Sequence, residues 1–274
     1  MSGSPNRTGH SGLSSTTREG LLLTALILLG WLISLIGLLQ LDFGQLPEPV
    51  LVPLVFGAVL IRTLLQTGLF IVGHDAMHRV LLPESRGWND RLGTLALALY
   101  AALPYGRCRA NHQRHHRFTA SGKDPDFHGD VGAGVFGWYR RFMAGYLTVG
   151  QMALLLAAWG LLALIARGAT PLGGWNVLLF CTLPLLLSSL QLFLVGTYLP
   201  HRGQRSPERQ ARPHSLDLPP WISLLACYHF GYHREHHDRP DLAWFQLPRH
   251  RRRSARARLT PRLASLSGIS PWKV

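Results

Sequence analysis

The sequence has few cysteines and no recognisable dinucleotide fingerprint. Its three cysteines, Cys108, Cys181 and Cys227, are widely spaced and form no CxxC pair. This pattern predicts neither a disulfide framework nor a zinc ribbon. The one G-x-G-x-x-G match, at residues 132–137, follows no strand-like run, so we expect no site for a flavin or nicotinamide cofactor on this chain. If the chain carries out redox chemistry, its electrons must come from another molecule.

Acidic residues are also scarce. There are 14 of them against 28 lysines and arginines, which gives a formal net charge of +14. A strongly basic chain can bind nucleic acid. Here, however, the basic residues flank long apolar runs, where anionic lipid headgroups explain them more simply. We therefore expect a lipid bilayer as a partner and no nucleic acid.

Long apolar runs dominate a chain that is 47% hydrophobic. About 20 apolar residues, rising ~1.5 Å each, span a hydrocarbon core of ~30 Å. A signal peptide is the alternative for the first run, but that run exceeds the usual core of ~7–15 residues and no small-residue cleavage site follows. Shorter stretches at 92–103 and 218–232 predict interfacial or re-entrant pieces. We predict an all-α integral membrane protein with about four transmembrane helices, at residues 21–39, 50–72, 146–166 and 175–199.

The basic residues are distributed unevenly between these runs. The connection at residues 40–49 contains no lysine or arginine, whereas residues 73–145 contain ten. By the positive-inside rule, both termini and the central segment lie in the cytosol, which predicts a place in the cytoplasmic (plasma) membrane. We divide the chain into a disordered segment at 1–17, a membrane domain at 18–248 and a basic tail at 249–274.

Ten of the fourteen histidines fall into short groups. On a helix, residues i, i+3 and i+4 lie on one face, so each group can direct its imidazoles at one point. Neutral imidazole suits iron, copper, nickel and zinc. A structural zinc takes four ligands and a catalytic zinc about three, so this many histidines predict two metal ions. All groups are expected at the cytosolic face. They are His74 and His78; His112, His115 and His116; His201; and His229, His233, His236 and His237.

Carboxylates lie close to these histidines in the sequence. Metal-bound histidines usually donate their second N–H to a carboxylate, which fixes the tautomer. We predict this role within the catalytic centre. The alternative for each is a solvent-exposed charge that balances nearby arginines. The carboxylates are Asp75, Asp124, Asp126, Glu235 and Asp238.

Membrane helices combined with three histidine boxes resemble the membrane fatty-acid desaturase/hydroxylase superfamily. Four sequence words are similar, more specifically, to the CrtW-type β-carotene ketolases: GHDAMH at 73–78, DPDFH at 124–128, GTYLPHR at 196–202 and CYHFGYHREHH at 227–237. Two positions depart from that pattern. Arg79 stands where glycine usually follows the first box, and residues 243–248 read AWFQLP where Pro-Trp-Trp commonly precedes Leu-Pro. These departures bear on substrate preference more than on reaction type.

The resemblance implies a reaction and its cofactors. A β-ionone ring would be oxidised at C4 to a ketone by two successive hydroxylations and loss of water. The reaction would use two Fe2+ ions, O2 and an external donor such as reduced ferredoxin with its reductase. β-Carotene would give echinenone and canthaxanthin, and zeaxanthin would lead towards astaxanthin. Within the superfamily pattern, His201 is the expected ninth iron ligand, and His229 competes for that place.

Some assignments stay open at this stage. Tyr198, Tyr232, Trp244 and Phe245 are candidates to line a polyene channel, although aromatic residues are common at membrane interfaces. Arg62, inside the second run, either lines a pocket with Gln66 or seals helix packing.

Three alternative functions are compatible with parts of this pattern. A fatty-acid desaturase or a carotenoid 3-hydroxylase would use the same scaffold. A membrane metal transporter would require acidic residues or histidines within the spans, and the four apolar runs contain none.

Overall fold

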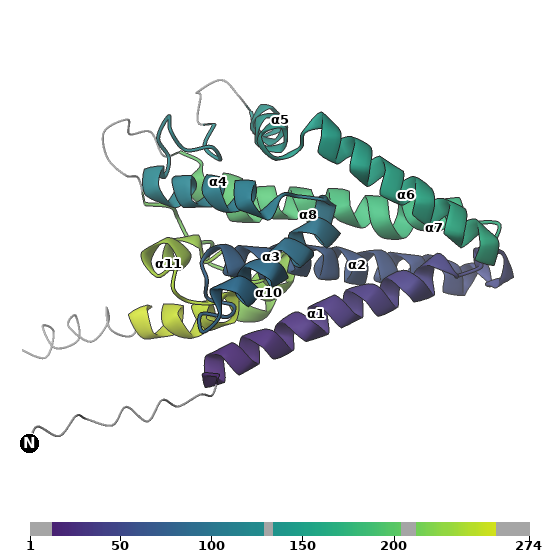
Figure 1. Ribbon diagram of the computed structural model, residues 1–274, viewed down its shortest axis with the longest axis horizontal. Coiled ribbons are helices and arrows are strands. Elements are labelled where there is room, and N and C mark those ends of the chain that lie inside the picture. Colours follow the sequence, from purple (N-terminus) through teal and green to yellow (C-terminus); the bar gives the residue numbers. More distant parts are fainter. Residues whose placement is uncertain (1–12, 129–133, 204–211, 256–274) are drawn as a thin grey trace, which may run out of the picture.

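The computed structural model describes residues 13–128, 134–203 and 212–255, and these residues form helices without strands (Figure 1). The all-α prediction is therefore confirmed. In chain order the elements are α1 (Ser15–Leu39), η1 (Phe43–Gln45), α2 (Glu48–Met77), α3 (Arg86–Ala101), α4 (Tyr105–Phe118), α5 (Val135–Tyr146), α6 (Val149–Ala169), α7 (Gly173–Val177), η2 (Leu178–Thr182), α8 (Leu183–Phe193), η3 (Leu194–Tyr198), α9 (Leu199–His201), α10 (Pro220–Cys227), α11 (His233–Asp238) and η4 (Trp244–Gln246).

Within the described ranges, four helices are long and apolar enough to cross a membrane. They are α1, α2, α6 and the continuous helix Gly173–His201, and each overlaps one predicted run. The first begins earlier than its apolar run because Ser14 caps it, accepting a hydrogen bond from the Thr17 N–H. Residues 15–17 of the predicted disordered segment are therefore helical, and residues 1–12 lie outside the described part. In the predicted basic tail, residues 249–255 are helical as well.

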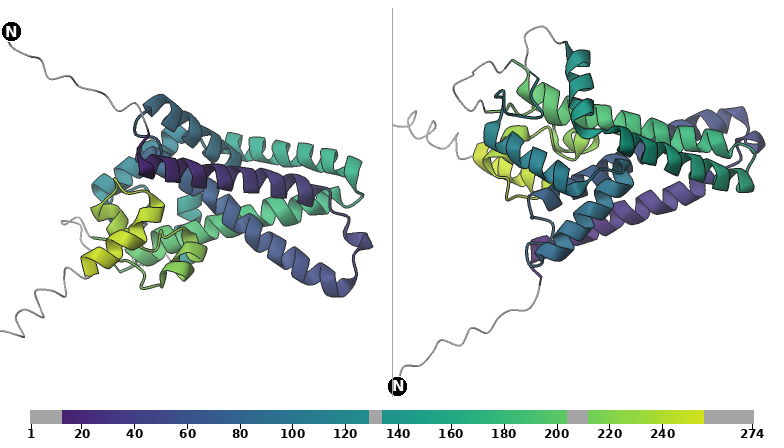
Figure 2. Two further views of the ribbon diagram at one scale, coloured as in Figure 1. Left: turned by 90° about the horizontal axis from the view of Figure 1, so that it is seen from below. Right: turned by 45° about the horizontal axis from the view of Figure 1, so that its top comes forward.

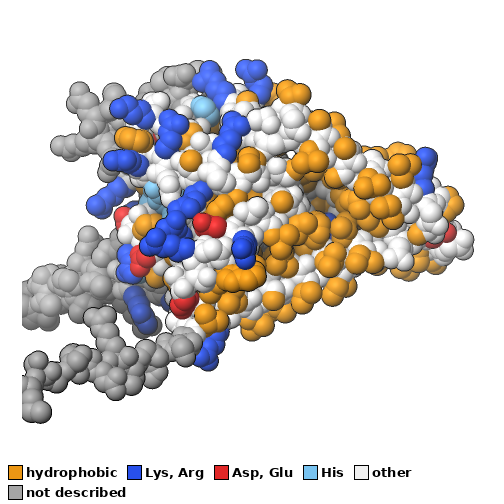
Figure 3. Space-filling view, viewed as in Figure 1, with side chains coloured by type: hydrophobic (Ala, Val, Ile, Leu, Met, Phe, Trp, Pro, Cys, Tyr) orange, Lys and Arg blue, Asp and Glu red, His pale blue; other side chains and the backbone are white. Residues whose placement is uncertain are grey.

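The two ends of the helix bundle differ. The α1–α2 and α6–α7 turns lie at one end, and α4, α11 and the start of α1 lie at the other (Figure 1). Lysines and arginines gather at the α4–α11 end, while apolar side chains cover the length of the spans (Figure 3). The short apolar stretches form α3 and α10, in the half of the molecule that contains α4 and α11. A basic end and an apolar belt are typical of a bilayer-spanning protein.

Close packing of α3 on α2 positions the first histidine box. A Cβ atom at Gly93 would lie 2.6 Å from the Ala76 Cβ, and one at Gly73 would lie 2.6 Å from the Leu97 side chain. Side chains at these two positions would force the helices apart. The glycines thus allow α3 to lie directly against the end of α2 where the box occurs.

The last span departs from regular α-helix at two five-residue π-helical segments, η2 and η3. Pro184 has no N–H to donate to the Phe180 carbonyl one turn earlier. Arg62 of α2 supplies the missing donor, because its Nε donates to that carbonyl at 2.9 Å. Its Nη1 donates to the Trp31 carbonyl of α1 at 2.7 Å. The arginine therefore links three spans, which is the helix-packing role left open by the sequence. Arg62 and Gln66 also line a cavity, so the second role left open applies as well.

The third span has a peripheral place. In α6 only Ala166 is buried, and the helix runs along the edge of the bundle in Figures 1 and 2. Its remaining surface is available to lipid or lines internal space.

Candidate metal centre

The structure gathers nine histidines into two neighbouring groups. They come from the end of α2, from α4, from α9 and from α11, at the basic end of the molecule. Each histidine offers one ring nitrogen, and within each group these nitrogens all lie within 4.8 Å of one another. The first group consists of His74, His78, His112, His116 and His236, and the second of His115, His201, His233 and His237.

Each H-x-x-H-H box is divided between the two groups. In α4, His112 and His116 point to the first group and His115 to the second. In α11 the division is reversed: His236 belongs to the first group, and the i, i+4 pair belongs to the second. The expectation that each box directs all its imidazoles at one point was wrong. With 3.6 residues per turn, successive residues are about 100° apart, so adjacent histidines cannot share one focus.

The spacing of the ring nitrogens fits metal ligation. Nε2 of His78 lies 2.7 Å from Nε2 of His112, and Nε2 of His201 lies 2.9 Å from Nε2 of His233. A neutral imidazole carries one N–H, so a cluster of mutually facing Nε2 atoms cannot be satisfied by hydrogen bonds alone. Two ligand nitrogens at right angles and ~2.1 Å from an ion lie ~3.0 Å apart. The two groups therefore have the donor set and spacing that two ions require.

These imidazoles are held in the form that can bind a metal. Burial, followed by the charges of neighbouring histidines, lowers the pKa of His78 to about 4 and that of His116 to about 2. The same causes lower the pKa of His112, His233 and His236 well below the usual value. All are therefore neutral near pH 7, with a lone pair available.

Asp124 supports His115 directly. Its two oxygens lie 2.9 and 3.0 Å from Nδ1 of His115. Burial opposes a charge on His115, but the hydrogen bond and charge of Asp124 outweigh it, so the pKa of His115 is raised. The carboxylate is itself fixed by the backbone N–H groups of Ala120 and Asp126, each at 2.9 Å. With Nδ1 donating to Asp124, Nε2 of His115 is left to face the second group.

Asp126 links the second group to a tyrosine. Its Oδ2 lies 3.9 Å from Nδ1 of His115, and its Oδ1 accepts a hydrogen bond from the Tyr146 hydroxyl at 2.7 Å. Burial raises the pKa of Asp126 to about 6. Sequence reasoning did not single out Tyr146, which stands at the edge of an apolar run where nothing distinguishes it from an interfacial aromatic residue.

The other three predicted carboxylates lie in different surroundings, and Asp238 is exposed. Asp75 lies beside the first group, with Oδ1 3.5 Å from Nδ1 of His74, and its Oδ2 accepts the Trp244 N–H at 3.2 Å. Glu235 instead accepts a hydrogen bond from the Ser215 hydroxyl and pairs with Arg251 at 3.1 Å. Glu235 thus pairs with an arginine, as the alternative expected, but it is buried and not exposed to solvent.

His229 lies outside both groups. The prediction placed it four residues before His233 on one helix, but α10 ends at Cys227 and the next two residues adopt left-handed backbone, with φ of 47° at Tyr228 and 66° at His229. This turn breaks the helical register. The His229 ring stacks on Tyr232, with centroids 5.6 Å apart. Of the two candidates for a ninth position, the structure brings His201 to the centre and leaves His229 beside it.

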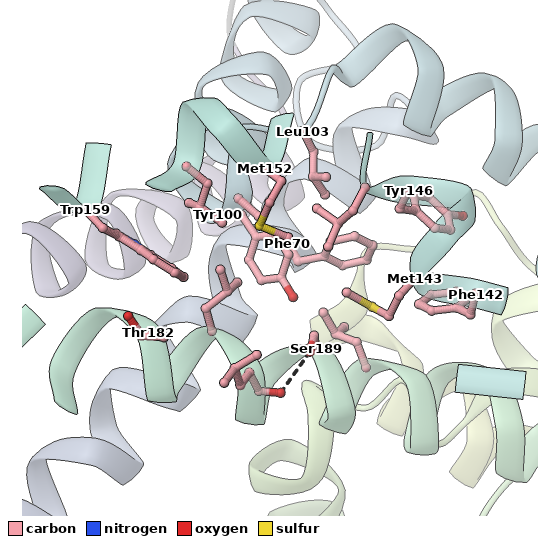
Figure 4. Close-up of a pocket in the computed structure, with 16 residues that line it drawn as sticks. Phe70, Tyr100, Leu103, Phe142, Met143, Tyr146, Met152, Trp159, Thr182 and Ser189 are labelled. Carbon is pink, nitrogen blue, oxygen red and sulfur yellow. Dashed lines mark hydrogen bonds between the residues drawn. The ribbon is translucent and has the colours of Figure 1, made fainter. Parts of the chain in front are cut away.

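An apolar cavity leads to the histidines. This cavity, which we name the middle cavity because it has a further cavity on either side, has a volume of about 170 Å³. It lies among α2, α3, α5, α6 and α8 (Figure 4). A second cavity, the metal-side cavity, adjoins it and is lined by residues that include His74, His112, His115 and His233. Four residues line both cavities and mark their junction: Phe70, Phe142, Tyr146 and Leu192.

The four aromatic residues proposed for a polyene channel line neither cavity. The Tyr198 ring packs on Trp138, with centroids 5.3 Å apart. The Tyr232 hydroxyl donates to the Leu218 carbonyl at 2.8 Å. Trp244 packs on Tyr228, and Phe245 lies against Gly20 of α1. Residues that line the cavity have no sequence signal of their own, because an apolar side chain facing a cavity looks like one facing lipid.

Helical spans, two clustered histidine groups and an apolar cavity that ends between them define a membrane protein with a candidate two-metal centre. The sequence profile of the fatty acid desaturase family matches residues 49–267, and the chain belongs to that family. The family resemblance seen in the histidine boxes is thereby confirmed.

Individual relatives carry more specific names. A β-carotene ketolase of Paracoccus sp. (strain PC1) is 38% identical over 252 residues, which cover 90% of this chain and 98% of the relative. A β-carotene ketolase of Haematococcus lacustris is 40% identical over 207 residues, covering 73% of this chain and 62% of the relative. A zeaxanthin 4-ketolase of Chlamydomonas reinhardtii is 40% identical over 204 residues, or 72% of this chain. The match spans only 44% of that relative's length.

The contact between Asp124 and His115 gives a testable prediction. Asp124→Asn keeps the shape of the side chain but removes the charge that holds the His115 tautomer. Loss of such a supporting group typically weakens metal affinity by about 10–100-fold, and we expect an effect of that size. Competition with a chelator, followed by metal analysis, measures it. Asp238→Asn is the matched control, because that carboxylate is exposed beside His237; equal losses in both variants would contradict the assignment.

Proposed function

We propose that this protein is a di-iron β-carotene 4-ketolase of carotenoid biosynthesis. The observation that carries the proposal is an apolar cavity that ends at two facing histidine groups. Relatives of similar sequence named β-carotene ketolase and zeaxanthin 4-ketolase support a β-ionone ring as the part of the substrate that reacts.

The first histidine group would hold one iron and the second group the other, which makes nine ligands with His201 included. When bound, the irons would supply the O2 activation needed to break a C–H bond, which redox-inert zinc does not provide. Asp124 and Asp126 would hold His115 from behind. His229 is not assigned as a ligand.

The chain's own residues would bind and orient the substrate. Phe70, Phe142 and Leu192 at the cavity junction would hold the ring against the metal-side cavity and exclude water. Each hydroxylation consumes one O2, two electrons and two protons, and releases one water. Two hydroxylations at C4 give a geminal diol, which loses water to form the ketone.

The electrons would come from a separate donor, such as reduced ferredoxin and its reductase. The basic end that carries the histidines would face the cytosol of the cytoplasmic membrane, in keeping with the positive-inside rule. In this orientation a soluble donor reaches the metal centre from the cytosol, and an apolar substrate reaches the cavity from the bilayer.

Expression in a bacterium that accumulates β-carotene tests the proposal, with pigments separated by chromatography and identified by mass. We expect a 4-keto product that His236→Ala abolishes. Unchanged β-carotene with verified membrane expression and bound iron would overturn the substrate assignment. A 3-hydroxylated pigment, or a new double bond in the fatty acids, would indicate instead the 3-hydroxylase or the desaturase on the same scaffold. Parallel expression with zeaxanthin shows which carotenoid is preferred.

A further inference from the structure

A third cavity adjoins the middle one, and no histidine lines it. This outer cavity, of about 590 Å³, lies among α1, α2, the end of α3, α6 and the η2–α8 segment. It shares Tyr100, Leu155, Trp159 and Leu185 with the middle cavity. The metal-side, middle and outer cavities therefore form one series, each joined to the next by residues that line both.

The polar side chains at the outer cavity are already engaged. Gln66 accepts a hydrogen bond from Trp31 Nε1 at 2.7 Å and donates to the Tyr100 carbonyl. Arg62 donates to the carbonyls of Phe180 and Trp31. The remaining lining consists mainly of leucines and alanines of α3, α6 and α8. A cavity with occupied polar groups and apolar walls is suited to a hydrocarbon ligand.

The series is also long. Leu192 marks the junction with the metal-side cavity, and Cys181 lines the outer cavity. These positions are 11 residues apart on the last span, which corresponds to ~16 Å of helix at ~1.5 Å per residue. A fatty-acid chain can bend to fit a short pocket, but the conjugated chain of a carotenoid is rigid and carries a second ring at its far end. With one ring at the histidines, the rest of the molecule extends away from the metal side, in the direction of the middle and outer cavities.

Resting on the proposed function, we infer that the outer cavity is the binding site for the far ring of the carotenoid, the ring that is not being oxidised. The bicyclic substrate is then held at both ends inside the protein, and its length as well as its reacting ring is recognised. One wall is α6, which is otherwise largely exposed, so the far ring can enter sideways from the bilayer.

Two adjacent alanines of α6 provide a matched test. Ala158 lines the outer cavity, and Ala157 lines none of the three cavities; both are exposed on the same helix. Ala158→Trp should fill the far-ring site, and Ala157→Trp should add the same side chain towards lipid. Each purified variant is assayed with β-carotene and with a shortened β-apo-carotenal, which has one β-ionone ring and ends within the middle cavity.

We expect Ala158→Trp to lower ketone formation from β-carotene by about 10-fold or more, an effect of the size given by misplacing a substrate. It should convert the shortened substrate within about twofold of wild type, and Ala157→Trp should convert both normally. Bound iron, measured on the same samples, should be unchanged.

Unaltered conversion of β-carotene by Ala158→Trp would overturn the inference, because the far ring would then lie elsewhere. Loss of both substrates with iron retained would also overturn it. If Ala158→Trp loses its iron, the same three measurements are made on Leu154→Trp, with Leu156→Trp as its control. Leu154 lines the outer cavity and Leu156 does not. Failure of wild type with both substrates would refute the proposed function itself, a result distinct from all of these.

Discussion

His201→Ala is expected to release one of two bound metal ions and to abolish ketone formation, whereas His229→Ala should retain both ions. His201 is almost fully buried, at 1% exposure, and its Nε2 faces the second group. That group contains only four histidines, so removing one leaves three donors and an opening. The ring of His229 instead stacks on Tyr232, outside both groups.

Metal analysis of the purified proteins gives the number of ions per chain, and pigment chromatography gives the activity. We expect the activity of His201→Ala to fall by about 100-fold or more, since the proposed chemistry needs both ions. If His229→Ala lost a metal while His201→Ala kept two, the ligand assignment would be reversed. The pair is well matched, because both changes remove a buried imidazole at the same end of the molecule.

Leu192→Trp should block the reaction without disturbing the metals. Leu192 lines both the metal-side and the middle cavity and is buried, at 6% exposure. A tryptophan there would fill the junction through which the ring must reach the histidines. We expect ketone formation to fall by about 100-fold or more, because a substrate held away from the reacting position loses the advantage of proximity.

Leu190→Trp is the control for this change. Leu190 lies on the same helix, is 40% exposed and lines none of the three cavities. It should retain both metals and most of the activity. Overpacking a buried position costs ~1–3 kcal/mol, so the metal content of Leu192→Trp must be measured as well. Normal conversion of β-carotene by Leu192→Trp would show that the substrate takes another path.

The sequence was sufficient to predict the spans and the gathering of the histidines. Hydropathy located four long helices because a bilayer leaves few alternatives to an apolar helix. The spacing of the boxes indicated metal binding because imidazoles at helical spacing can converge. The division of each box between two groups was missed. It depends on how α4 and α11 face each other, and that arrangement is set by tertiary packing.

Two further features lay beyond sequence reasoning for physical reasons. The left-handed turn at Tyr228 and His229 is unusual for residues other than glycine, so a continuous helix was the natural expectation. The cavity-lining residues Phe70 and Leu192 belong to apolar runs in which lipid-facing and cavity-facing side chains have the same composition. Arg62 is unusual in an apolar run, but its link to the carbonyl left without a donor by Pro184 depends on how α2 packs against the last span.

The division of the boxes has a consequence for the order in which the protein is made. Four members of the first group precede residue 117 in the chain, but the fifth, His236, follows the last span; the second group likewise takes two of its four members from α11. Neither group is complete until the ribosome has passed α11. By then the helices that wall the cavity have all been synthesised, so a nascent chain would have no complete oxidising centre before it has a place to hold the proposed substrate.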